Sequence, residues 1–403
     1  MKEKQFREQL SQQAPEVPEL FSMRVEKTLE RIVIQEANMK ESTKEALRTG
    51  CRISRRTIAL ALALMLSLGA FAYAATQWHL FDSLSFMVGN NTPVNADKIM
   101  QSNLAQETVN GVDIDVQEAG YDGKTLFVRY AYKMNDVDTP LGMYRTGEGG
   151  DGVSEEDMTL LADHQVGWWI DHLWIDGKCV DMPNNSGSIT SGSTTPGELI
   201  QTEYWRLDNE GIMLNNKVNI SLPIGERQSL SDYTKADHPE MYTDDGELKE
   251  PSKGIVKFTL DTTDVEKLVR TENPNIPFTS EKGTVQVSEV CYSPLMTYIT
   301  LKIDGNSDAL AAYKEKNGEG YTDENGNLMW SFSTMDMYTE WLTSLELVDG
   351  DGQQLFLDHY GNNGYGDTWA EYDYPYIENV PEELYLAPIV NGAADMTQAV
   401  KVK

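Results

Sequence analysis

The chain has few of the residues that build metal centres and disulfide scaffolds. Its 403 residues include 3 cysteines and 5 histidines. Cys51, Cys179 and Cys291 are too scattered to form a zinc-binding cluster. Cys179 and Cys291 could pair, or each could be a free thiol in an apolar strand. His164 and His172 are separated by an acidic loop and a tryptophan-rich stretch. We therefore expect neither a metal nor another cofactor.

No recognised catalytic motif occurs at a usable spacing. The sequence contains no His-Glu-x-x-His segment, no Gly-x-Ser-x-Gly segment and no glycine-rich phosphate loop. Between Tyr321 and Trp330, Asp323, Asn325 and Asn327 alternate as in a calcium loop, but the distal glutamate is missing. The same residues favour tight turns, which is the preferred interpretation. We expect no enzymatic activity.

Positive charge is scarce after residue 56. The chain has 33 Lys/Arg and 64 Asp/Glu, a net charge of −31. Residues 1–56 hold 12 of the basic and 9 of the acidic residues, which leaves 21 basic against 55 acidic residues for the rest. An acidic surface repels phosphate backbones, so we expect no direct contact with nucleic acid.

One uncharged stretch, Thr57–Phe81, is long enough to cross a bilayer as a helix. Arginines precede it, and no Lys or Arg follows until Lys98. The positive-inside rule then predicts a cytoplasmic N-terminus and an extracellular C-terminal part. We expect a single-pass cell-membrane protein with its transmembrane helix at 57–78, and with Trp78 and Phe81 at the membrane interface.

A cleaved signal peptide is the alternative interpretation of this stretch, because Ala72-Tyr73-Ala74 has the small-x-small pattern of a cleavage site. A secretory signal is normally complete within about 15–30 residues. Here 56 residues precede the apolar run, which favours an anchor. Ala72 and Ala74 remain a candidate processing site.

Residues 1–56 predict a helical cytoplasmic tail. Within Pro18–Arg48, four apolar side chains recur at helical spacing and form a narrow stripe: Phe21, Val25, Leu29 and Ile32. So short a segment cannot bury a core of its own. The stripe therefore predicts contact with a partner protein, a second copy or the inner leaflet, unless the tail is partly disordered.

The remainder of the chain predicts a mostly β fold. Apolar and polar residues alternate, with Asn110-Gly111 and Asp176-Gly177 as hairpin turns. The segment from Ile114 aligns without gaps on the segment from Val285, 171 residues later, which indicates a duplicated unit. We expect two tandem immunoglobulin-like β-sandwiches, at 104–240 and 241–403, after a juxtamembrane stalk at 79–103. The polar stretch Ser231–Gly254 is the predicted linker.

The most aromatic stretch is "GWWIDHLWIDGK", which begins at Gly167. In a strand, Trp168 and Trp174 lie on the same face. They could form an exposed platform for a ligand, or they could be core residues, as tryptophans in sandwich strands usually are.

The layout resembles a Gram-positive family of single-pass, anti-sigma-factor-like membrane proteins with an extracytoplasmic domain of unknown function. Three segments carry the resemblance: "VPELFSMRVEKTLERI", "AFAYAATQWHLFDSL" and "NGVDIDVQEAGYDGKTLFVRYAY". It implies that Phe21, Val25, Leu29 and Ile32 bind a sigma factor, that the outer part senses an envelope signal, and that cleavage occurs near the membrane. The zinc-type anti-sigma motif is missing, because the tail has no histidine and only Cys51.

A second hypothesis is a cell-surface adhesion protein that recognises a wall polymer, a glycan or a protein ligand. The striped tail helix argues against it, because adhesion needs no such helix. The sequence names neither the sigma factor nor the envelope ligand.

Overall fold

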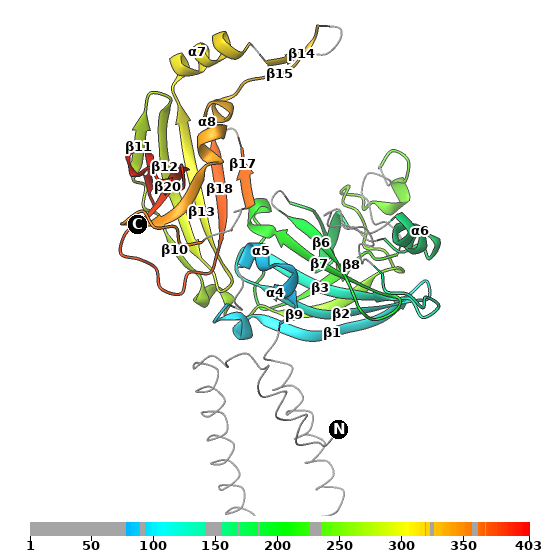
Figure 1. The fold of residues 1–403 in the computed structure, drawn as a ribbon. Helices are drawn as coiled ribbons and strands as arrows, with labels where there is room; N and C mark the ends of the chain where they lie inside the picture. Colours follow the sequence, from blue (N-terminus) through cyan, green and yellow to red (C-terminus); the bar gives the residue numbers. More distant parts are fainter. Residues whose placement is uncertain are drawn as a thin grey trace, which may run out of the picture. The chain divides into compact units, whose positions relative to one another are not determined.

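The computed structural model describes residues 78–88, 93–141, 155–167, 170–183, 186–225, 235–318, 320–322, 326–356, 362–366 and 368–403 (Figure 1). They belong to one compact unit, Gln77–Lys403. The predicted tail and all of the predicted transmembrane helix except Trp78 lie outside these residues, and so do the tail stripe and the candidate processing site. No helix within the described ranges is long and apolar enough to span a membrane.

The described fold is mostly β, as the sequence predicts, and its first half contains two sheets. The larger sheet has the strand order β1-β2-β3-β7-β6 and the smaller one β5-β4-β8-β9. Their strands are β1 (Met100–Val109), β2 (Val112–Tyr121), β3 (Thr125–Lys133), β4 (His172–Ile175), β5 (Lys178–Asp181), β6 (Gly187–Gly192), β7 (Glu198–Arg206), β8 (Lys217–Leu222) and β9 (Val256–Asp261).

The second half repeats this plan, with the sheet order β10-β12-β13-β18-β17 and a smaller sheet around β16-β19-β20. In addition, β11 pairs with β12 and β21 with β19. The strands are β10 (Arg270–Glu272), β11 (Pro277–Ser280), β12 (Gly283–Tyr292), β13 (Met296–Gly305), β16 (Leu345–Asp349), β17 (Asn362–Tyr365), β18 (Trp369–Pro375), β19 (Leu384–Val390), β20 (Ala393–Ala394) and β21 (Val400–Lys401). A separate hairpin consists of β14 (Gly320–Thr322) and β15 (Leu328–Ser331).

The helical elements are short. The α-helices are α4 (Leu80–Ser83), α5 (Ser85–Val88), α6 (Glu155–Asp163), α7 (Ser307–Asn317) and α8 (Thr334–Leu342), and the 3-10 turns are η1 (Ala96–Lys98), η2 (Leu207–Glu210), η4 (Pro239–Met241), η5 (Val265–Leu268) and η6 (Met396–Gln398). A capping box explains where α8 begins: the Ser333 hydroxyl accepts from the Asp336 N–H, and the Asp336 carboxylate accepts from the Ser333 N–H.

The predicted repeat is confirmed by the strand pairing. β2 begins at Val112 and β12 at Gly283, and both hairpins are antiparallel. The register shifts between Val116 and Glu118 in the first hairpin and between Val287 and Glu289 in the second. Each residue of the first pair precedes its counterpart by 171 positions, so even the irregularity of the strand is repeated.

Alternation of apolar and polar residues places one face of each strand inward. In β9, every second residue from Val256 is buried and the residues between them are exposed. Asn110 and Gly111 both adopt positive φ, at 51° and 85°, which is the geometry of the tight turn predicted between β1 and β2. Both sheets of a half contribute to its core, an arrangement consistent with a β-sandwich.

The stalk expected at 79–103 is folded instead. This stretch includes α4, α5, η1 and the start of β1, and most of its described apolar side chains belong to the first core, although Val94 is 59% exposed. Trp78 and Phe81, expected at a membrane interface, are 9% and 5% exposed in that core. Burying several large apolar side chains stabilises this packing against an extended stalk.

The boundary between the halves also differs from the expected position at 240/241. β9 pairs with β8 along its whole length, so the first half continues past residue 261. The predicted linker Ser231–Gly254 therefore connects two strands of one sheet rather than two domains. Its Leu248 is 6% exposed. The first core even includes Leu295 and Tyr298 from the second half.

Candidate functional site: a buried polar junction between the two halves

The two halves meet at equivalent turns of their repeated hairpins. Asp122 follows β2, and Ser293 follows β12 exactly one repeat length later in the alignment. The Ser293 hydroxyl donates a 2.5 Å hydrogen bond to Asp122 Oδ2, and the Tyr298 hydroxyl donates a second one of 2.7 Å. Asp122 Oδ1 accepts from the N–H groups of Lys124 and Thr125. The buried Asp122 carboxylate thus stabilises the turn after β2 and also binds two side chains of the second half.

A buried arginine makes the second link. Arg206, at the end of β7, is fully buried and donates to Glu371 and Asp373 on β18, with 3.0 Å to Asp373. Asp208 also accepts from it. Its guanidinium lies 4.0 Å from the centroid of the Tyr298 ring. Two carboxylates of the second half therefore balance one cation of the first in a water-poor site.

Lys124 adds a third ionic link at the edge of this cluster. Its ammonium lies 2.9 Å from Asp208 and 2.7 Å from Glu289 on β12. Together, Arg206 and Lys124 bind four carboxyl groups: Asp208 of the first half, and Glu289, Glu371 and Asp373 of the second. We call Lys124, Arg206 and their carboxyl partners, with Asp122, Ser293 and Tyr298, the polar junction.

Burial raises the pKa of two carboxyl groups in the polar junction. Desolvation is the main cause for Asp122, opposed by hydrogen bonds from Ser293, Thr125, Tyr298 and Lys124. Desolvation also raises the pKa of Asp373 to about 7, although Arg206 acts in the opposite direction. The Glu371 carboxylate adds repulsion to that rise. The site can therefore take up a proton near neutral pH.

This property predicts a pH dependence of stability. A carboxyl group whose pKa is about 7 in the folded chain and near 3.8 when unfolded binds more protons in the folded state between these values. The contribution of Asp373 to the free energy of unfolding should therefore fall as pH rises from about 4 to about 7. Relative to Asp373→Asn, the unmodified chain should lose stability between pH 5 and pH 8 in urea titrations. A constant difference across this range would contradict the assignment.

A second polar contact fixes the start of the folded unit. Glu118 on β2 is 6% exposed, and its carboxylate accepts from the backbone N–H groups of His79 and Leu80 at 3.0 and 2.6 Å. Trp78 Nε1 donates to Asp97 at 2.8 Å. A buried carboxyl group that accepts two backbone hydrogen bonds fixes the position of the chain at those residues. The residues that directly follow the predicted membrane stretch are thus attached to the sheet.

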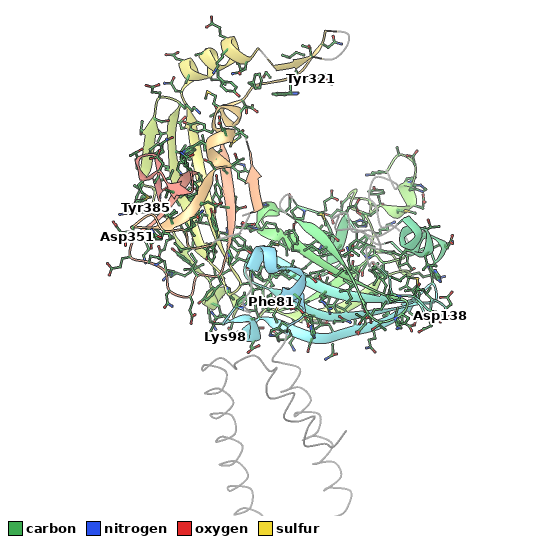
Figure 2. All side chains as sticks on the ribbon, in the orientation of Figure 1. Phe81, Lys98, Asp138, Tyr321, Asp351 and Tyr385 are labelled. Carbon is green, nitrogen blue, oxygen red and sulfur yellow. The ribbon has the colours of Figure 1, made fainter. Side chains whose placement is uncertain are left out.

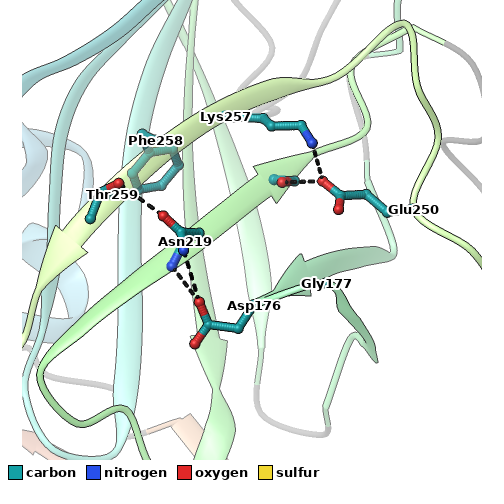
Figure 3. A pocket seen from close by; sticks show the side chains of 8 residues that line it. Asp176, Gly177, Asn219, Glu250, Lys257, Phe258 and Thr259 are labelled. Atoms are coloured by element: carbon teal, nitrogen blue, oxygen red, sulfur yellow. Dashed lines mark hydrogen bonds and ion pairs between the residues drawn. The ribbon is translucent and has the colours of Figure 1, made fainter.

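A shallow depression of about 560 Å³ lies on the smaller sheet of the first half (Figure 3). It is lined by Asp176, Gly177, Asn219, Ser221, Glu250, Lys257, Phe258 and Thr259. Its polar groups bond to one another: Asn219 donates to Asp176 and accepts from Thr259, and Lys257 pairs with Glu250 at 2.7 Å. Since these groups already satisfy one another, we assign no ligand to the depression.

The residues expected at a ligand surface do not form one in the described part of the chain. Trp174 is fully buried, and its Nε1 donates to the carbonyl of Leu248 at 3.3 Å. Its ring contacts that of His172 edge to face. The core interpretation therefore holds for Trp174, while Trp168 lies outside the described residues. Among those residues, no group of three His, Cys, Asp or Glu is placed to hold a metal ion.

Cys179 and Cys291 do not form a disulfide with each other. Cys179 is partly buried and Cys291 buried, and both are free thiols. Burial raises the pKa of each thiol to about 12, so neither is an activated nucleophile at neutral pH.

Sequence reasoning missed Asp122, Arg206 and Glu118. The 171-residue offset aligns Asp122 with Ser293, but an alignment does not show that two equivalent turns pack together. Arg206 and Glu118 occur within ordinary strand patterns and carry no sequence signal of burial.

No protein-family model matches the chain, and no curated protein matches it. Among solved structures, it is similar to a conserved domain protein from Bacillus anthracis, with 14% identity over 78% of this chain and 93% of the other. The TM-score is 0.36. This similarity carries no argument about function, which has to be inferred from the residues themselves.

Proposed function

We propose that the chain is a membrane-anchored regulator of the anti-sigma-factor type. In this proposal, residues 1–56 bind a sigma factor in the cytoplasm through Phe21, Val25, Leu29 and Ile32. The apolar stretch that begins at Thr57 and ends before the buried Trp78 anchors the chain, and two immunoglobulin-like sandwiches form the extracytoplasmic sensory region. The acidic balance after residue 56 and the striped helix before the apolar stretch support this order of parts.

The observation that carries the proposal is that the fold begins at Trp78, directly after the apolar stretch that we propose as the anchor. Trp78 is already in the first core, and Glu118 binds the backbone at His79 and Leu80. The polar junction joins the second half to the first through buried charges. In this proposal, a rearrangement in either half acts on Trp78, His79 and Leu80, the first described residues after the proposed anchor.

The first experiment uses residues 1–56 as bait for the cell's own cytoplasmic proteins. We expect capture of a sigma factor, and loss of capture with Val25→Asp or Leu29→Asp, because a charge in the apolar stripe disrupts helix docking. Lys27→Asp introduces the same side chain on the opposite helical face and should retain capture.

A reporter for the captured sigma factor then tests the sensory region. Deleting residues 78–403 should change reporter output in growing cells. If output stays unchanged, the outer part is not a sensor. If the bait captures no sigma factor, or all three variants behave alike, the regulatory proposal is wrong and the adhesion hypothesis gains support.

A further inference from the structure

The β14–β15 hairpin presents large apolar side chains to solvent. Tyr321, Leu328, Met329 and Trp330 are 57%, 54%, 61% and 48% exposed. Nine large apolar side chains are exposed in the described ranges, and these four lie together on one hairpin. Figures 1 and 2 show the hairpin, with Tyr321 labelled, projecting away from the sheets of the second half. Clustered exposure of this kind marks an interaction surface, whereas scattered apolar residues do not.

Aromatic contacts connect the hairpin to the helix before it. The Tyr313 ring on α7 meets Phe332 edge to face at 5.3 Å, and Phe332 meets Trp330 in the same way at 5.0 Å. Gly320 lets the strands approach closely, because a Cβ there would lie 2.0 Å from the Trp330 carbonyl oxygen. The hairpin therefore has a defined shape in which Tyr321 and Trp330 are directly opposite partners.

The strand edges are open as well. Within the described residues, neither β14 nor β15 pairs with a third strand. An isolated two-stranded hairpin is only marginally stable in water, and unpaired strand edges accept an added strand. Both the apolar side chains and the backbone thus favour an extended partner segment.

Charge decides which partner fits. Residues 57–403 contain 21 basic and 55 acidic residues, and the sequence from Ser307 to Trp330, which includes α7, contains five acidic residues and two lysines, Lys314 and Lys316. A second copy would bring the same negative charge to the surface, and anionic lipid would do so too. A basic segment meets attraction instead.

We propose that the β14–β15 hairpin is a docking surface for a cationic peptide segment with alternating apolar residues, which adds to it as a strand. This inference rests on the proposed function, because a cationic segment bound here would be the signal that the proposed sensory region detects. Apolar side chains of the segment cover Leu328 and Trp330, and its basic side chains face the acidic surroundings.

The test uses the full chain in nanodiscs and a labelled peptide of alternating lysine and leucine. Fluorescence anisotropy should show binding that is at least about tenfold weaker for the double variant Leu328→Ser/Trp330→Ser, since each removed side chain buries apolar area in the complex. Met213→Ser, at a residue that is 64% exposed in the first half, is the matched control and should leave the Kd unchanged. Two control peptides alternate glutamate with leucine or lysine with serine. Each should bind the unmodified chain no more tightly than it binds the double variant.

Hydrogen exchange on the unmodified chain gives a readout that needs no variant. The lysine–leucine peptide should protect the amides of Leu328–Ser331 or Gly320–Thr322. Three results would overturn the proposal. The lysine–serine peptide could bind as tightly as the lysine–leucine peptide, the double variant could bind as tightly as the unmodified chain, or the peptide could protect amides outside the hairpin. The β14–β15 pairing itself protects some amides without peptide. Additional protection without peptide that is lost on dilution would identify a second copy, and additional protection that is lost in detergent would identify lipid; either result overturns the proposal.

These measurements involve neither the tail nor a sigma factor. Failure of peptide binding therefore leaves the capture experiment unaffected, and a tail that captures nothing leaves peptide binding measurable.

Discussion

Replacing Arg206 by methionine should lower the free energy of unfolding by about 3–5 kcal/mol. The loss of stability arises from the two carboxyl groups that stay buried. Glu371 and Asp373 are 4% and 2% exposed and would lose the cation that they share. Methionine fills part of the space but cannot donate hydrogen bonds. The effect should be as large as that of removing a large core side chain, because the buried carboxyl groups would lose the cation that balances their charge.

Urea titration monitored by tryptophan fluorescence measures this loss. The loss should be smaller at pH 5 than at pH 8, since burial already raises the pKa of Asp373 to about 7 and a proton can neutralise its carboxyl group at the lower pH. Lys267→Met removes one side of an exposed ion pair with Asp264 and serves as the matched control, which should leave the unfolding midpoint unchanged. An Arg206→Met chain within about 1 kcal/mol of the parent would show that the polar junction does not hold the halves together.

Replacing Trp174 by alanine should cost about 3–5 kcal/mol of stability, the range for removing a large aromatic side chain from a core. Trp174 is fully buried on β4, packs against His172 and bonds to the carbonyl of Leu248. Its removal would leave a cavity and an unpaired carbonyl between β4 and the connection from β8 to β9. A ligand-binding role would predict the opposite result, with stability retained.

The same titration compares Trp174→Ala with Trp330→Ala. Trp330 is 48% exposed on the projecting hairpin, so its replacement should change the free energy of unfolding by less than about 1 kcal/mol. If the two variants were equally stable, the assignment of Trp174 to the core would be wrong. The pair therefore separates a structural tryptophan from one that is available to a partner.

The sequence alone predicted the mostly β character and the repeat because both depend on local rules. Alternation of apolar and polar residues identifies strands, and Asn-Gly and Asp-Gly identify turns that need positive φ. The 171-residue offset located β12 and β13 correctly from β2 and β3. The same local rules could not decide whether Trp174 is a core residue or part of an exposed surface. Alternation shows which side chains share a face of a strand but not what covers that face.

The site depended on contacts between residues far apart in the chain. Asp122 and Ser293 meet only because the two equivalent turns pack together, and Arg206 becomes a buried cation only because β18 lies against the end of β7. The prediction of a stalk at 79–103 was wrong for the same reason. In the sequence, the apolar residues from Trp78 onward look like the end of a membrane stretch, whereas in the fold they are buried in the first core. Local periodicity thus determined the strands, whereas burial, pairing of charges and the attachment of Trp78 were decided by tertiary packing. Solvent exclusion at those positions is a property of the assembled fold and of no single segment.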